Sequence, residues 1–210
     1  MLNNKKFKAA LKKWGRKHGR LVVISSPTAG GKTTVCAELI RSDSSCVRSV
    51  SCTTRLPRKG EKNGVDYHFV SAKIFKERIK EGFFLEWARV HDSYYGTPRK
   101  YAETLLRKGL NVILTIDVKG GRQVKENFKD ACLIFLLPPS FKEMLGRIKR
   151  RGTESLEAVE LRLKTAEKEI KELPAYGYLV INDTLREAVG SIKAIIKAEN
   201  SKLKPVKEEI

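Results

Sequence analysis

The chain is organised around a strand, a turn and a helix near its N-terminal end. Leu21 to Ile24 is a short apolar, β-branched run, which is typical of a buried strand. A turn of small residues from Ser25 to Gly31 follows, and Lys32-Thr33-Thr34 then opens a segment with apolar residues at helical spacing. This is the context of a phosphate-binding P-loop, because backbone N–H groups and the helix start together form a nest for an anion. The sequence therefore predicts a site for a nucleoside triphosphate.

Single residues of this loop have expected roles. Lys32 adds a point charge for the phosphates, and the Thr33 hydroxyl can reach Mg²⁺. The usual pattern G-x-x-x-x-G-K-[ST] is met at Gly31-Lys32-Thr33, but Ser26 stands at its first position. Glycine serves there because it adopts positive φ, and serine in that region costs about 1–2 kcal/mol. The alternative interpretation is an ordinary strand–turn–helix connection with a surface lysine.

Composition limits the class of protein. At 210 residues, 41% hydrophobic and 32% charged, the chain suits one domain or one core with small inserted subdomains. No apolar run approaches the roughly 20 residues of a membrane span, and the N-terminus lacks the apolar region of a secretory signal. The four cysteines form no C-x-x-C pair and no metal-binding spacing, which favours reduced thiols. We therefore expect a cytoplasmic protein.

The net charge of +19 favours anionic partners, either nucleotides or nucleic acid, without choosing between them. Residues 1–20 contain eight of the 43 lysines and arginines and no acidic residue. Within 1–19, Phe7, Leu11 and Trp14 fall at helical spacing among lysines. One interpretation of this basic arm is contact with RNA or an anionic membrane surface. The other is a solvated extension that packs its aromatic residues on the core.

The remaining pattern alternates between strands and helices. Short strands around one helix, between the P-loop helix and the next core strand, predict a small inserted subdomain. One expected strand begins at Val47. The others cover Asp66–Val70, Phe83–Val90, Val112–Asp117, Cys132–Leu137 and Leu179–Asp183, and a turn is expected at Tyr94–Pro98. Expected helices cover Ala72–Glu81 with Ser71 as cap, Arg99–Lys108 before Gly109, Ser140–Lys149, Leu156–Leu173 and Leu185–Glu199.

A series of motifs in this order makes the chain resemble a guanylate kinase from about Arg20 to Ile196. They are SSPTAGGKTT, SVSCTTRLPRKGEKNGVDYHFVS, FLEWARVHDSYYGTP, ILTIDVKG, LLPPS, RIKRRGTE, ELRL and VIND. The resemblance implies ATP + GMP ⇌ ADP + GDP with Mg²⁺, a reaction of purine nucleotide metabolism. It implies an α/β P-loop kinase with a parallel core sheet flanked by helices, an inserted small α+β GMP-binding subdomain and a helical lid.

The resemblance also divides the chain. The expected segments are a basic N-terminal arm at 1–19, core at 20–48, a GMP-binding subdomain at 49–98, core at 99–140, a lid region at 141–170, core at 171–200 and a charged tail at 201–210. Deoxy-GMP is expected as a second acceptor, because nothing in the sequence reads the 2′-hydroxyl group.

On the donor side, Arg147, Arg151 and Arg162 match the lid and transfer-site arginines of the family. Together with Lys32 they are the expected catalytic residues, because a loose phosphoryl-transfer transition state needs positioned cations. Asp117 stands at the end of a buried strand and resembles a Walker B acid, which holds Mg²⁺ through water. Thr33 is the other expected metal ligand. The expected ATP-binding residues are Ser26, Pro27, Thr28, Ala29, Gly30, Gly31, Lys32, Thr33, Thr34 and Asn182.

On the acceptor side, the resemblance assigns the phosphate of GMP to two arginines and two tyrosines. Arginine suits a phosphate because its planar fork binds two oxygens at once. Guanine presents N1–H and N2–H₂ together, and the carboxylate of Glu86 can accept from both. The hydroxyls of Ser51 and Thr97 match those that reach guanine O6 or N7. The expected GMP-binding residues are Ser51, Arg55, Arg58, Tyr67, Glu86, Tyr95, Thr97 and Asp117.

Three departures from the family pattern stand out. Ser26 and Ala29 replace P-loop glycines, Thr115 stands where an acid is common, and Lys119 replaces a glutamine. The rival interpretations are a non-catalytic guanylate-kinase-like module that binds phosphorylated proteins, an RNA-binding protein, and a kinase for another acceptor. The P-loop lysine and the lid arginines argue against the first, and Glu86 argues against the last.

Overall fold

A computed structural model describes residues 4, 18–90, 92–150 and 156–202. Its core is a five-stranded sheet in which every neighbouring pair is parallel. The strand order is β2 (Cys46–Arg48), β7 (Asn111–Leu114), β1 (Leu21–Ser25), β8 (Cys132–Leu137) and β9 (Tyr178–Ile181). The P-loop strand β1 is therefore central, as its fully buried sequence indicates.

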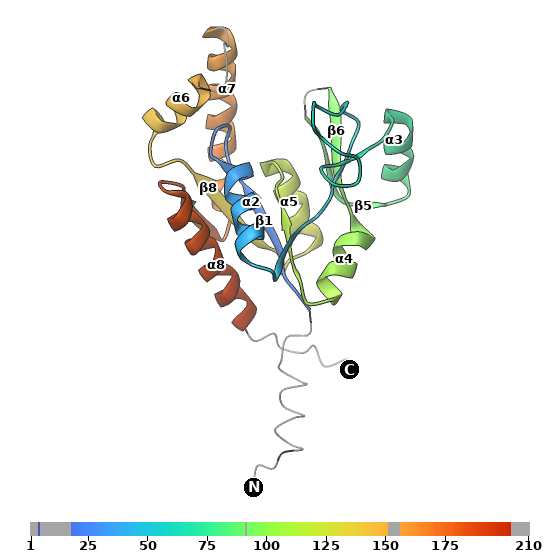
Figure 1. Cartoon of the computed structure of the whole chain (residues 1–210). Helices are drawn as coiled ribbons and strands as arrows, with labels where there is room; N and C mark the ends of the chain where they lie inside the picture. The colour runs from blue at the N-terminus through green and yellow to red at the C-terminus, as the bar shows by residue number, and fades with distance from the viewer. Residues whose placement is uncertain (1–3, 5–17, 91, 151–155, 203–210) are drawn as a thin grey trace.

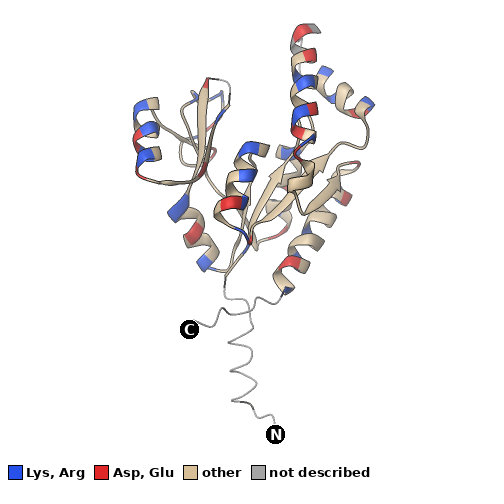
Figure 2. Cartoon of the chain, turned by 180° about the vertical axis from the view of Figure 1, so that it is seen from behind, with Lys and Arg blue, Asp and Glu red and all other residues tan. Residues whose placement is uncertain are grey.

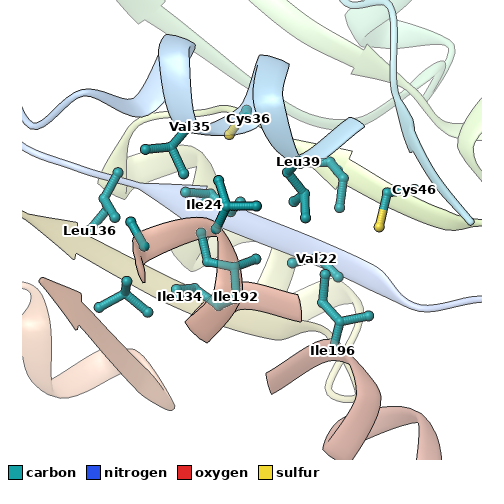
Figure 3. Close-up of a cluster of buried hydrophobic side chains, with 14 of the residues drawn as sticks. Val22, Ile24, Val35, Cys36, Leu39, Cys46, Ile134, Leu136, Ile192 and Ile196 are labelled. Atoms are coloured by element: carbon teal, nitrogen blue, oxygen red, sulfur yellow. The ribbon is translucent and has the colours of Figure 1, made fainter. Parts of the chain in front are cut away.

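Helices cover both faces of this sheet, which gives a three-layer α/β fold (Figure 1). Alternate residues of β1 face opposite layers, because successive side chains of a strand point to opposite sides. Val22 and Ile24 pack with α2 (Lys32–Ser42) and α8 (Leu185–Ser201), in the cluster of Figure 3. Leu21 and Val23 pack on the other face with residues of α4 (Arg99–Arg107) and α5 (Val118–Asn127). Burial on both faces explains why the core strands are continuously apolar.

A second, smaller sheet has four strands in the order β4 (His68–Phe69), β3 (Cys52–Thr53), β6 (Ser93–Pro98) and β5 (Phe84–Val90). The helix α3 (Ala72–Lys80) is capped by Ser71, whose side chain accepts a hydrogen bond from the backbone N–H of Ile74. Phe75 of α3 stacks on Phe84 of β5 with ring centroids 4.4 Å apart. Leu85 of the same strand joins the core cluster under α4 and α5. This residue anchors the small sheet to the large one.

Two further helices lie beyond β8. They are α6 (Phe141–Lys149), capped by the Ser140 side chain, and α7 (Leu156–Ile170), followed by a 3₁₀ turn at Leu173–Ala175. Met144, Ile148 and Ala166 of these helices form an apolar cluster with Ala29 of the P-loop. In Figures 1 and 2, α6 and α7 stand on the opposite side of α2 from α3 and the β5–β6 pair.

Charged residues lie mainly along the helices, while the strands of the core sheet carry almost none (Figure 2). No helix among the described residues is long and apolar enough to cross a membrane. The arm at 1–19 lies almost wholly outside the described residues, as does the tail from 203, so the expectations for both stay predictions.

The expected α/β class is confirmed, and several elements differ in detail. Tyr94–Pro98, expected as a turn, belongs to strand β6, where Tyr95 pairs with Ala88 of β5. The strand expected to reach Asp117 ends at Leu114. The expected strand Asp66–Val70 is reduced to the two residues of β4.

Helix α5 is missing from the sequence expectation. Its Gly120-Gly121 pair lowers helix propensity, since glycine is disfavoured in helices. The pair is needed for packing: a Cβ at Gly120 would lie 2.7 Å from Glu86 Oε2, and one at Gly121 would lie 2.5 Å from the Tyr176 hydroxyl. Tertiary contact, invisible to local patterns, decides this helix.

Candidate active site

The P-loop is held closed by one amide side chain. Gly31 caps α2 with φ of 89°, a left-handed conformation that favours glycine. The side chain of Asn182, at the carboxyl end of β9, is buried and donates a hydrogen bond of 2.8 Å to the Gly30 carbonyl. A Cβ at Gly31 would collide with that amide. Asn182, expected near the donor adenine, therefore also fixes the loop itself.

The two glycine replacements of the loop behave differently. Among described residues other than glycine, positive φ occurs at Ala29, with φ of 64°. The expectation of strained, left-handed backbone at Ser26 is thus wrong. The Cβ of Ser26 instead lies against Gly30. The Ala29 methyl group is buried against Met144 and Ile148. Its burial, worth about 0.8 kcal/mol, offsets part of the roughly 1–2 kcal/mol that left-handed backbone costs an alanine.

Lys32 points beneath the loop rather than into solvent. Its Nζ donates a 2.9 Å hydrogen bond to the carbonyl of Ile116. Burial lowers the pKa of Lys32, while the thiol of Cys36 and the carboxylates of Asp117 and Glu169 oppose that shift. Asp117 itself caps α5, since its Oδ1 accepts a hydrogen bond of 2.8 Å from the Gly120 N–H.

Glu169 is a residue of this site that sequence reasoning missed. It lies near the end of α7, close to Lys32, and its carboxylate accepts a hydrogen bond from the Thr28 backbone. Burial raises the pKa of Glu169 despite that bond. In the sequence it is one of several glutamates on a charged helix, so no local pattern separates it from exposed neighbours such as Glu160 and Glu167.

The structure describes two of the three expected lid arginines. Arg147 of α6 donates a hydrogen bond of 3.1 Å to the Asn182 carbonyl, which brings it to the P-loop. Its Nε also lies 3.8 Å from a carboxylate oxygen of Glu143. Arg162 is half-buried on α7. Arg151 lies outside the described residues, so its role stays a prediction.

A cavity of about 500 Å³ opens between the start of α2 and the small sheet. Of the expected GMP-binding residues, all except Thr97 line it, together with Lys32 and Thr33. The remaining lining residues are Cys36, Ala37, Ile40, Arg48, Glu61, Asp66, Ala88, Val90, Gly96, Thr115 and Ile116. The structure therefore brings seven of the eight expected acceptor-side residues to one cavity, next to the P-loop lysine.

Glu86 lines this cavity, and a buried hydroxyl group holds its carboxylate in place. The Thr97 hydroxyl, fully buried, donates a hydrogen bond of 2.6 Å to Glu86 Oε1. Ser51 Oγ lies 3.5 Å from the same threonine hydroxyl. Burial raises the pKa of Glu86 to about 7, with the charge of Asp117 adding to the shift against the Thr97 hydrogen bond. The carboxyl group is therefore poised between its neutral and ionised forms at neutral pH.

Arg55 lies at another part of the cavity and is already paired. Its two terminal nitrogens donate to the two oxygens of Glu61 at 2.9 and 2.8 Å. The backbone N–H of Arg58 adds a third hydrogen bond to Glu61, whose pKa is held at about 2 mainly by the Arg55 fork. The Tyr67 and Tyr95 rings meet edge to face with centroids 6.0 Å apart. These four expected phosphate ligands form one cluster.

Comparison with known proteins decides the family. A family model described as guanylate kinase matches residues 18–199. The chain belongs to the guanylate kinase family. Its relatives include the guanylate kinase of Clostridium tetani, 47% identical over 192 residues that span 91% of this chain and 92% of that protein. That of Caldanaerobacter subterraneus is 46% identical over 188 residues, spanning 90% and 91%.

A solved structure agrees with this assignment. The crystal structure of guanylate kinase from Anaplasma phagocytophilum matches with a TM-score of 0.74 and 35% identity, covering 89% of each chain. These relatives support catalysis over the non-catalytic interaction module. Within the family pattern, the exposed Lys119 lies away from the cavity lining, whereas Thr115 is part of it.

The residues expected to hold a metal in this chain fit magnesium chemically. Thr33 and Asp117 line one cavity and offer a hydroxyl and a carboxylate, the hard oxygen ligands that Mg²⁺ prefers. No cluster of three or more His, Cys, Asp or Glu residues suited to a metal occurs in the described residues. A sparse set of protein ligands is typical of Mg²⁺ held partly by substrate phosphates.

Proposed function

We propose that this member of the family transfers the γ-phosphoryl group of ATP to GMP and to deoxy-GMP, giving ADP and the corresponding diphosphate. One observation carries the proposal: a single cavity contains Glu86, Arg55 and the P-loop lysine Lys32. A group that accepts from a base, a group that binds a phosphate and a P-loop cation thus share one space.

On the acceptor side, Glu86 accepts hydrogen bonds from guanine N1–H and N2–H₂ in its ionised form. Thr97 holds Oε1 of that carboxylate in place, and Ser51 lies beside Thr97 to reach the base. Arg55 and Arg58 bind the GMP phosphate, with the Tyr67 and Tyr95 hydroxyls as further donors. The bidentate contact of Arg55 with Glu61 exchanges for a contact with phosphate, which has similar geometry.

On the donor side, the P-loop of residues 26–34 binds the ATP phosphates through its backbone N–H groups. Lys32 leaves the Ile116 carbonyl to contact the transferred group. Arg147, Arg151 and Arg162 surround the same group and stabilise the charge that spreads over its oxygens in the transition state. Asn182 holds the loop while it contacts the adenine side of the donor.

Magnesium is the proposed cofactor, and Thr33 and Asp117 are the residues that would hold it. When bound it neutralises charge on the transferring phosphates. Residues 49–98 and 141–170 act as the acceptor subdomain and the lid, and we infer that both close over the substrates to exclude water. A cytoplasmic location, and contact of the arm 1–19 with nucleic acid or an anionic surface, remain predictions.

The test is a coupled assay for ADP release with Mg-ATP and GMP, with GDP identified by chromatography. Turnover that requires GMP and is abolished by EDTA supports the proposal. ADP release without GDP, or GMP binding without turnover, contradicts it and favours the non-catalytic module. A small-angle scattering profile that fails to compact with GMP and a non-hydrolysable ATP analogue contradicts closure alone.

A further inference from the structure

Arg48 is a charged residue in an unusual place. It is the last residue of β2, at the carboxyl end of the core sheet, where ligands bind in open α/β folds. The other residues of the five core strands, all described, include no Asp, Glu, Lys or Arg. Its half-buried side chain lines the cavity that also contains Lys32 and Arg55.

The guanidinium of Arg48 has no carboxylate within ion-pair distance among the residues that the structure describes. Its neighbour on α2 is the thiol of Cys36. Burial raises the pKa of this thiol to about 12, although the charge of Arg48 opposes the rise. The thiol is therefore neutral and does not balance the charge. Arg55, in contrast, is held by both oxygens of Glu61. A partly buried cation without a counter-ion is costly, so a bound anion stabilises it.

The same guanidinium lies beside the phosphate-side aromatic residues. The Cζ of Arg48 is 5.6 Å from the centroid of the Tyr67 ring, and the Cζ of Arg55 is 5.5 Å from the same centroid. One arginine from strand β2 and one from the loop after β3 thus converge on one tyrosine. Because arginine stays charged and presents a planar fork, such a pair suits an anion with several oxygens.

We propose that Arg48 binds the phosphate of the acceptor nucleotide, as a third arginine beside Arg55 and Arg58. The inference rests on the proposed function, which names that acceptor as a guanosine monophosphate. The competing explanation is structural: Arg48 only packs on Tyr67 and keeps its ring in place. The two differ in whether the effect of removing Arg48 depends on the phosphate.

The test compares Arg48→Met with Arg41→Met in the full chain. Arg41 lies on α2 with its side chain 75% exposed, so its loss removes the same charge away from the cavity. For Arg48→Met we expect the Kd of GMP, from calorimetry, to rise about tenfold or more, as for loss of a charged hydrogen bond. The inhibition constant of guanosine, which lacks the phosphate, stays within about twofold, and Arg41→Met changes neither.

An unchanged Kd for GMP overturns the inference, and an equal loss for GMP and guanosine assigns Arg48 to packing on Tyr67. If Arg48→Met does not fold, Arg48→Lys carries the test, because it keeps the charge and loses the fork. Arg48→Lys should raise the Kd of GMP about threefold or more and leave the inhibition constant of guanosine unchanged. Wild-type turnover is measured alongside: its absence contradicts the proposed function, while the binding comparison still decides the role of Arg48.

Discussion

The acceptor side and the donor side of the cavity at α2 differ in how their polar groups and backbone are held. On the acceptor side, the polar groups are paired with one another: Arg55 with Glu61, and Glu86 with Thr97. On the donor side, the P-loop is held by the Asn182 amide and by burial of the Ala29 methyl group. Under the proposed function the acceptor side exchanges partners when its ligand binds, whereas the backbone of the donor loop already has its shape.

This difference predicts where specificity and rate reside. Groups that exchange partners carry the choice of ligand, because a ligand that cannot replace the lost hydrogen bonds leaves buried polar atoms unpaired. The prearranged backbone of the P-loop receives the phosphates without reorganising, and only the Lys32 side chain of the loop exchanges a partner, the Ile116 carbonyl. Substitutions on the acceptor side should therefore change the Kd and KM of GMP, and those on the donor side should change kcat or the KM of ATP.

The largest expected effect is that of Lys32→Met. It removes the P-loop cation and should lower kcat at least about 100-fold, with little change in the KM of GMP. Lys100→Met, on the exposed face of α4, is the matched control and should retain wild-type rates. Equal kcat values for the two variants would contradict a role of Lys32 in phosphoryl transfer.

Glu86→Gln should act on base selection. An amide presents one acceptor and one donor group, so it cannot accept from both N1–H and N2–H₂ of guanine. The ratio of kcat/KM for GMP over AMP should fall about 100-fold or more. Glu81→Gln, at the exposed end of α3, is the control. A ratio unchanged by Glu86→Gln would show that another group reads the base.

The pH dependence of GMP affinity should follow Glu86. Burial raises its pKa to about 7, and guanine binds the ionised form, so protonation competes with the ligand. Protonation of Glu86 should leave the Kd of GMP constant above that pKa and raise it about tenfold for each pH unit below it. In Glu86→Gln only the second ionisation of the GMP phosphate, with a pKa of about 6, should still change the Kd. Wild-type and Glu86→Gln profiles of the same shape would contradict this use of the carboxylate.

Asn182→Ala should have a moderate effect. It removes the hydrogen bond to the Gly30 carbonyl and should raise the KM of ATP about fivefold, as for loss of one neutral hydrogen bond. The KM of GMP should not change. An effect on GMP as large as that on ATP would mean that the two sides are not independent.

Ala29→Gly should have the smallest effect. Glycine relieves the left-handed backbone but loses the buried methyl group and gains entropy in the unfolded chain. These terms nearly cancel, so the free energy of unfolding should change by less than about 1 kcal/mol. A stabilisation of several kcal/mol in denaturant unfolding would mean that Ala29 strains the loop more than its packing offsets.

The sequence predicted the strand, turn and helix of the P-loop and the other core strands because motif and hydrophobic period agree there. Its eight proposed acceptor residues stay a prediction, and seven of them line one cavity. It missed α5, whose Gly120-Gly121 pair makes sense only against Glu86 and Tyr176. It placed strain at Ser26 when the left-handed residue is Ala29, because conformation at a loop position depends on its packing against α6 and α7.

Two further residues of the site carry no signal in the sequence. Glu169 is one glutamate among many on α7, and Arg48 is one arginine in a basic chain. What distinguishes them is position: Glu169 reaches the Thr28 backbone, and Arg48 turns into the cavity beside Tyr67. Such contacts join segments that are far apart in the chain, so only the folded structure reveals them.

The most direct test of the account is the ratio of kcat/KM for GMP to that for AMP, measured with Mg-ATP on the full chain. A site that reads guanine by buried hydrogen bonds rejects the wrong base by about 10⁴-fold or more, which is the predicted ratio. A ratio near one, or a preference for AMP, would contradict the assignment of Glu86 and its cavity to the guanine nucleotide.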